Sequence, residues 1–126
     1  MTHFKLNAPD VSAEHFDNEV LTVNIVSGRY YSIKNTAAIF LRLVLDGNSK
    51  ENAVAKIAEL FTVNPNDIKD DFNSFVSELI VEKIIVESTT PEKIVSTDWI
   101  AQANIEMYVQ PMVEIHTDME ELALLS

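Results

Sequence analysis

The stretch of residues 20–40 constrains the fold more than any other part of the chain. It predicts a strand, a turn, a second strand and the start of a helix, with no spacer between them. The two strands, expected at about 19–25 and 29–33, are rich in β-branched and aromatic residues and flank a turn that contains Gly28, which is typical of a β-hairpin. Residues 34–36, Lys-Asn-Thr, then provide a helix N-cap. A short exposed sheet beside a helix can accept a peptide as an extra strand, and nothing in the stretch is typical of catalysis.

Composition limits the chain to one core. With 126 residues, 47% of them hydrophobic, we expect a single domain with an appendage. The chain contains no cysteine, which excludes a disulfide framework and a thiolate metal site and favours a reducing compartment. The first ten residues lack the apolar core of a signal peptide, and no apolar stretch is long enough to cross a bilayer. We therefore expect a soluble, cytoplasmic protein with no membrane partner.

The net charge of −11 argues against a nucleic-acid partner, because the protein would repel a polyanion. The charge is also uneven. Residues 1–86 hold 12 acidic and 8 basic residues, whereas residues 87–126 hold 8 acidic residues and one basic residue, Lys93. We therefore divide the chain into a domain, a linker and an acidic tail: 1–87, 88–98 and 99–126.

The remaining elements follow from apolar periodicity and capping signals. Residues 11–16 predict a first strand that joins the hairpin in a small antiparallel sheet. The helix at about 36–45 is apolar nearly all round, so it should be the most buried. Ser49 caps a second, amphipathic helix, and an Asn-Pro pair opens a third at 64–82, before an extended segment at 83–86. The expected fold class is α+β: a three-stranded antiparallel sheet, then three helices, then an extended C-terminal tail.

The third helix carries two stripes at helical spacing where a surface helix normally shows one. The first is wholly apolar and must belong to the core: Ile68, Phe72, Phe75 and Leu79. The second is mixed in polarity: Lys69, Asn73, Val76 and Ile80. Two interpretations stay open for the second stripe. Either its apolar members widen the core face, or the stripe forms one wall of a groove.

Three segments follow one another in an order typical of a known family. They are the run Gly-Arg-Tyr-Tyr-Ser-Ile-Lys-Asn-Thr-Ala-Ala-Ile at 28–39, the pair Asp46-Gly47, and the run from Phe72 to Val86. With them, residues 11–86, about two thirds of the chain, resemble the PqqD-like family, the RiPP recognition elements. Such modules hold the leader of a ribosomally made precursor peptide for a modifying enzyme.

The resemblance implies a winged-helix-like module of three strands and three helices with no chemistry of its own. In that family the leader lies antiparallel to the third strand and packs against the third helix. An exposed strand edge offers unpaired backbone groups that fix a peptide's register, and the adjacent groove selects its side chains. The residues that this implies for peptide binding come from the third strand and the second stripe: Arg29, Tyr30, Tyr31, Ser32, Ile33, Lys69, Asn73, Val76 and Ile80.

The two faces of the third strand are separated by alternation. Tyr31 and Ile33 share one face, and Tyr30 and Ser32 share the other. The sequence leaves open which face meets the core. It also leaves open whether each tyrosine contacts a ligand or only packs its ring in the fold, with its hydroxyl exposed to water.

The acidic tail contains a segment that is similar to the leader motif of lasso-peptide precursors. Tyr108 and Pro111 stand three apart, Val113 follows two further on, and Ile115 lies beyond them, but Thr117 replaces the later glycine of the motif. We hypothesise that this segment occupies a recognition groove, its own or that of a neighbouring copy in a homodimer. The residues before it span roughly 60 Å when extended, so reach permits both. An ordinary extended tail is the alternative.

Other functions find less support in the residues. A DNA-binding winged helix would present the carboxylates of the third helix to phosphates, without a basic stripe. Glu114, His116 and Asp118 alternate, but an exposed polar strand face explains them better than a metal site. The chain has no cysteine, only two glycines, no serine elbow and no phosphate loop. We expect no enzyme activity, no cofactor and no bound metal.

These patterns together predict a non-catalytic module that captures a precursor leader by strand addition and presents it to a peptide-modifying enzyme. Exchange of the tail or of a strand between two copies would give a homodimer. One alternative is a recognition domain fused to its own substrate, with the tail as the modified precursor segment. A winged-helix DNA-binding regulator is the other alternative.

Overall fold

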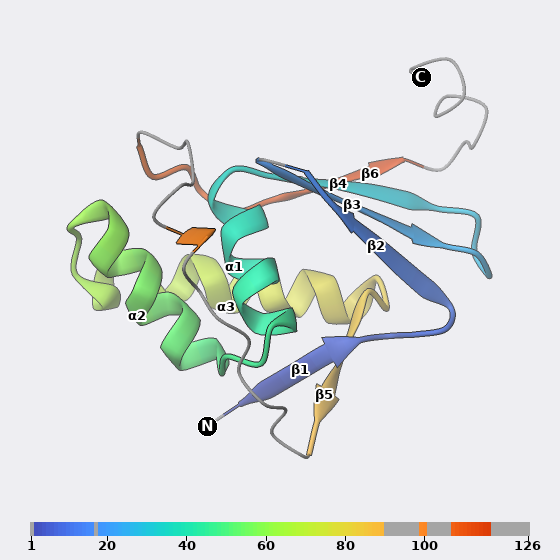
Figure 1. The fold of residues 1–126 in the computed structure, drawn as a ribbon, viewed down its shortest axis with the longest axis horizontal. Helices are drawn as coiled ribbons and strands as arrows, with labels where there is room; N and C mark the ends of the chain where they lie inside the picture. Colours follow the sequence, from blue (N-terminus) through green and yellow to red (C-terminus); the bar gives the residue numbers. More distant parts are fainter. Residues whose placement is uncertain (1, 17, 90–98, 101–106, 117–126) are drawn as a thin grey trace.

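The computed structural model describes residues 2–16, 18–89, 99–100 and 107–116 (Figure 1). Antiparallel strands precede three helices, and further strands follow, so the predicted α+β class is confirmed. The elements in chain order are β1 (His3–Leu6), β2 (Val11–His15), β3 (Glu19–Asn24), β4 (Tyr30–Lys34), α1 (Thr36–Leu45), α2 (Lys50–Phe61), α3 (Pro65–Val81), β5 (Ile85–Ser88) and β6 (Val113–His116).

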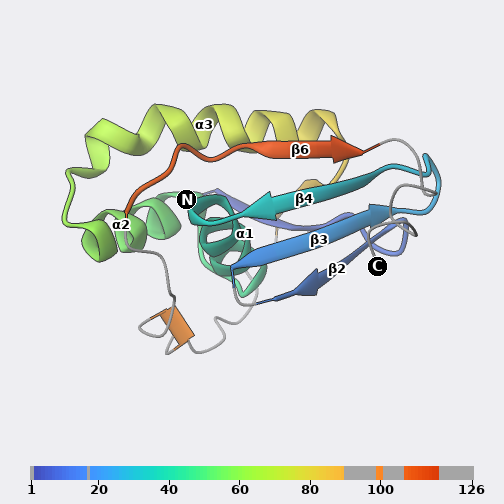
Figure 2. The ribbon, with the colours of Figure 1, turned by 90° about the horizontal axis from the view of Figure 1, so that it is seen from above.

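The larger sheet has the strand order β2-β3-β4-β6, and all its pairings are antiparallel (Figure 2). Strands β3 and β4 form the predicted hairpin. The Oδ1 atom of Asn24 accepts hydrogen bonds from the backbone N–H groups of Val26 (2.9 Å) and Ser27 (3.1 Å) in its turn. Gly28 closes the turn with a φ of 77°, a conformation that glycine adopts without strain. The fourth strand, β6, comes from the tail, which the sequence predicted only as an extended segment.

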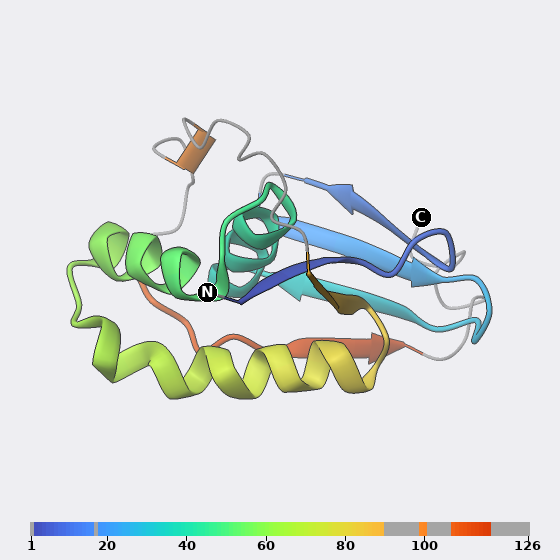
Figure 3. The same ribbon diagram turned by 90° about the horizontal axis from the view of Figure 1, so that it is seen from below.

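A second, two-stranded sheet pairs β1 with β5, with Phe4 opposite Glu87 and Leu6 opposite Ile85 (Figure 3). The extended segment predicted near 83–86 is therefore a strand. The sequence does not predict β1, because four residues show too little alternation to indicate a strand without its partner. Phe4 and Ile85 are both buried, so this pairing extends the core beneath α1.

Helix α1 begins directly after β4, and eight of its ten residues are buried, as its apolar surface predicted. Asn35 holds the predicted N-cap position, but its side chain makes no capping hydrogen bond, so that part of the prediction is wrong. The Asn35 backbone has a φ of 56° and its carbonyl accepts from the N–H groups of Ala38 (3.0 Å) and Ile39 (3.2 Å). The start of α1 is therefore held by the Asn35 backbone carbonyl and not by its side chain.

The other two helices carry the caps that the sequence predicted. Ser49 Oγ accepts from the Asn52 N–H at 3.1 Å at the start of α2, and Asn64 Oδ1 accepts from the Asn66 N–H at 2.9 Å at the start of α3. Each cap satisfies a backbone donor that the helix leaves unpaired. Within the described residues, no helix is both long and apolar enough to cross a membrane.

The core lies between the larger sheet and the helices, whose arrangement Figures 1 and 3 show. Phenylalanines from α1 and α3 form its centre. The rings of Phe40 and Phe72 stack with centroids 4.6 Å apart, and Phe75 meets Phe40 edge-on at 5.9 Å. All members of the first stripe of α3 are buried, as predicted. Val76 of the second stripe is buried as well, so the core face of α3 is broad.

We predict that Phe40→Ala lowers the free energy of unfolding by about 3–5 kcal/mol, because it empties a fully buried site that two other rings contact. The matched control is Phe16→Ala, since Phe16 is 54% exposed and its loss should change stability by no more than about 0.5 kcal/mol. Urea unfolding followed by circular dichroism measures both. Equal losses in the two variants would contradict the proposed core.

Candidate functional site

Strand β6 lies along the edge of β4, between that strand and α3 (Figures 2 and 3). The pairing is antiparallel, and its register places Ile33 opposite Val113 and Tyr30 opposite His116. Strand β4 is thus paired on both sides, with β3 and with the tail. Its outer backbone groups, which an isolated domain would leave unpaired, meet a strand of the same chain. This edge therefore accepts an antiparallel strand.

The inner face of the β4–β6 ladder meets the core, which answers the question that alternation leaves open. Tyr31 and Ile33 belong to the core cluster, and so does Val113, which is 8% exposed. Ile115 pairs with Tyr31 on the same face but is 43% exposed. The apolar anchoring of β6 is therefore strongest at Val113.

Tyr108 occupies an aromatic site ahead of β6, formed by α2 and α3. Its ring meets Phe61 edge-on with centroids 6.0 Å apart and Phe72 at 6.3 Å. Its hydroxyl donates to the Asp71 Oδ2 atom at 2.9 Å. Burial, followed by the Asp71 carboxylate, raises the pKa of Tyr108 far above its usual value. The neutral phenol is therefore the form that this site holds.

Two further contacts fix the backbone between Tyr108 and β6. The Val109 N–H donates to the Thr36 Oγ1 atom at 3.0 Å, and Thr36 is the fully buried first residue of α1. Pro111 is buried. Because proline fixes φ and favours an extended preceding residue, it suits a segment that must run straight into a strand. The stretch thus contacts the domain through Tyr108, Val109 and Val113, and Pro111 is buried between them.

Trp99 anchors the approach to this segment on α1. Its Nε1 atom donates to the Asp46 Oδ2 atom at 3.3 Å, and the Arg42 guanidinium carbon lies 4.1 Å from its ring centroid, a cation–π contact. Trp99 and Ile100 also pack against the core. The described parts of the tail therefore contact the domain at three places: the end of α1, the aromatic site of α2 and α3, and the edge of β4.

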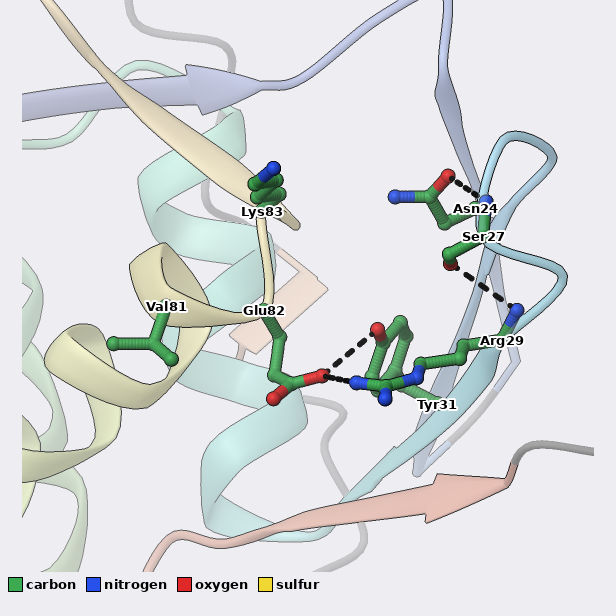
Figure 4. A pocket seen from close by; sticks show the side chains of 7 residues that line it. All are labelled: Asn24, Ser27, Arg29, Tyr31, Val81, Glu82 and Lys83. Carbon is green, nitrogen blue, oxygen red and sulfur yellow. Dashed lines mark hydrogen bonds and ion pairs between the residues drawn. The ribbon is translucent and has the colours of Figure 1, made fainter.

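A pocket of about 180 Å³ lies where the β4–β6 pairing ends, between the hairpin turn and the end of α3 (Figure 4). The Glu82 Oε1 atom accepts from Arg29 Nη1 at 2.9 Å and from the Tyr31 hydroxyl at 3.0 Å. Burial of Tyr31, followed by the hydrogen bond to Glu82, raises the pKa of that tyrosine. This cluster ties the start of β4 to the end of α3, the two elements that flank β6.

The structure brings the predicted third-strand residues and the predicted tail residues together. Four of the former face β6 across the ladder, namely Tyr30, Tyr31, Ser32 and Ile33, whereas the Arg29 side chain turns to Glu82. On α3, Val76 is buried and Asn73 half-buried, while Lys69 and Ile80 are exposed. Their roles in peptide binding stay predictions. The predicted tail residues all lie within the described part: Tyr108, Pro111, Val113 and Ile115.

Several contact residues escape sequence reasoning. Phe61, Asp71 and Phe72 surround Tyr108 although they belong to two helices. The sequence offers only one signal for this site, namely that Asp71 stands next to Phe72, a predicted core position of α3. Of the remaining tail, residues 101–106 and 117–126 lie outside the described residues, and the second range includes Thr117 and Asp118. Within the described part, no group of three or more His, Cys, Asp or Glu residues could hold a metal ion.

Comparisons with known proteins relate this chain to a family model and to a solved structure. Residues 19–85, more than half of the chain, match the family model of coenzyme PQQ synthesis protein D (PqqD). No curated protein matches the chain. The solved structure of TbiB1 in complex with the TbiA(beta) leader peptide is similar, with a TM-score of 0.60 and 19% identity, over 70% of this chain and 99% of that chain. At this identity the likeness shows a shared fold.

We predict that Tyr108 ionises only well above pH 10, the usual range for tyrosine. Because its pKa is raised in the docked tail, the neutral phenol stabilises docking below about pH 10, and this contribution is lost as the pH rises further. Titration at 295 nm should show that Tyr108→Phe removes an ionisation step above the usual range. Tyr31→Phe serves as the comparison, since the Tyr31 pKa is also raised. If Tyr108→Phe instead removes an ionisation step near pH 10, the burial of Tyr108 beside Asp71 would be contradicted.

Proposed function

This chain belongs to the PqqD family of RiPP recognition elements, and we propose on that basis that it binds the leader segment of a ribosomally synthesised precursor peptide. The observation that supports this most directly is the edge of β4, which carries an added antiparallel strand. TbiB1, which shares the fold, was solved with a leader peptide. We propose that a leader takes the place of β6 by strand addition.

Strand addition explains how one module can hold a peptide without chemistry of its own. Backbone hydrogen bonds to β4 supply affinity and fix the register, while pockets for alternate side chains supply selectivity. Here the Val113 position is the principal apolar contact, and the Tyr108 position reaches the aromatic site on α2 and α3. A leader with tyrosine and an aliphatic residue at this spacing fits both.

The family consists of non-catalytic peptide-binding chaperones. We therefore propose that a separate peptide-modifying enzyme acts on the bound precursor, in the cytoplasm, while this module holds the leader. The surface that meets the enzyme must leave the β4 edge accessible. An exchange of tails between two copies would instead leave each β4 edge occupied by the tail of the other copy, and it would produce a homodimer.

We propose that the chain's own tail competes for the site. A tethered segment acts at an effective concentration that reaches the millimolar range for short flexible connections. A free leader must therefore outcompete residues 107–116, which already hold the β4 edge and the Tyr108 site. The Trp99 contact with α1 keeps the tail near the site.

The test uses the full chain with its tail weakened by two substitutions, Tyr108→Ala and Val113→Asp. These remove the aromatic contact and place a carboxylate opposite Ile33. The probe is a synthetic peptide of residues 104–126, and calorimetry measures binding. We predict that the weakened chain binds the probe at least about tenfold more tightly than the unchanged chain, because the internal competitor is lost.

The matched control carries Met107→Ala and Met112→Asp, which change the same kind of residue at positions that are 70% and 63% exposed. It should bind the probe as weakly as the unchanged chain does. Circular dichroism confirms that the domain stays folded in each variant. A folded, weakened chain that does not bind the probe would overturn strand addition at β4.

A further inference from the structure

The outer face of the β4–β6 ladder carries contacts that the aliphatic positions of the tail do not explain. Side chains on this face alternate with those that enter the core. Residues Tyr30 and Lys34 of β4 belong to it, and so do Glu114 and His116 of β6. Both cross-strand contacts described here involve the side chain of a tail residue, so they depend on which peptide lies at the edge.

The first contact is a ring stack. Tyr30 and His116 are directly opposite in the register, and their rings lie nearly parallel, with centroids 4.5 Å apart and an angle of 9° between the planes. The Tyr30 side chain is 1% exposed, so its ring is held in one place. A fixed aromatic surface favours a planar group at the opposing position over an aliphatic one.

The second contact is an ion pair. The Lys34 Nζ atom lies 3.2 Å from the Glu114 Oε2 atom, and both side chains are about half exposed, at 49% and 48%. An exposed pair adds little affinity, but a like charge in the same place is unfavourable. The domain as a whole is acidic. Lys34 therefore gives this part of the ladder a local preference for an anion, although the negative net charge of the domain repels anions in general.

We propose that Tyr30 and Lys34 select among leaders through the outer face. The favoured guest carries an acidic residue one position after the buried aliphatic residue and a planar ring three positions after it. This inference rests on the proposed function. The inner face accepts a class of guests with suitable apolar residues, and the outer face distinguishes members of that class.

The test uses the full chain with Tyr108→Ala and Val113→Asp, and five peptides of residues 104–126 as probes. One peptide is unchanged, and the others carry Glu114→Lys, Glu106→Lys, His116→Ala or His116→Phe. The Glu106→Lys peptide is the matched control for charge, since it makes the same change seven positions before Val113. We expect the Glu114→Lys peptide to bind about threefold to fivefold more weakly than this control.

Exchange of the charge on β4 should reverse that preference. In a chain that also carries Lys34→Glu, the Glu114→Lys peptide should bind more tightly than the unchanged peptide. Loss of the ring in the His116→Ala peptide should weaken binding about twofold to tenfold, whereas the His116→Phe peptide should bind like the unchanged one. Calorimetry at low and high salt separates the two contacts, because only the ion pair is screened.

The outcomes separate this inference from the proposed function. If all five peptides bind with the same affinity, strand addition stands and selection by the outer face is overturned. If the Lys34→Glu chain shows no reversal, the role of Lys34 is overturned. If no peptide binds, the proposed function fails and this inference fails with it.

Discussion

The antiparallel pairing of β6 with β4 is the interaction on which the rest of the site depends. A strand at the edge of a sheet leaves a row of backbone donors and acceptors unpaired. In this chain the tail pairs with that row. The pairing in turn decides which tail side chains face the core and which face solvent, since a shift of one residue would reverse both faces. In the observed register Val113 belongs to the core cluster.

The other edge of the larger sheet, β2, is less suited to a guest. A peptide at β4 meets a strand on one side and α3 on the other, so it gains backbone pairing and side-chain contacts together (Figure 2). The residues of β2 beyond Val11 are mainly polar, and Ser12, Glu14 and His15 are exposed. Exposed polar and charged side chains are a common protection of sheet edges against unwanted pairing.

The parts of the fold that local patterns encode were predictable from the sequence. The hairpin, three helices and the caps at Ser49 and Asn64 follow from alternation, periodicity and residues near each helix start. The β1–β5 sheet depends on a pairing between distant segments, so no local pattern indicates it. The same distinction between local patterns and tertiary packing applies to the residues of the site. Tyr108, Pro111 and Val113 could be identified as a motif, but the aromatic site around Tyr108 exists only once α2 packs on α3.

The distribution of charge indicates that specific contacts, and not a general electrostatic attraction, hold the tail on the domain. Residues 1–86 carry a net charge of −4 and residues 87–126 a net charge of −7, so the tail and the domain repel one another at long range. Docking therefore relies on backbone pairing and on buried groups such as Val113, with the ion pair to Lys34 as a local exception. Added salt screens the general repulsion more than it weakens these short-range contacts. A basic protein that binds nucleic acid shows the opposite dependence, since salt reduces its affinity.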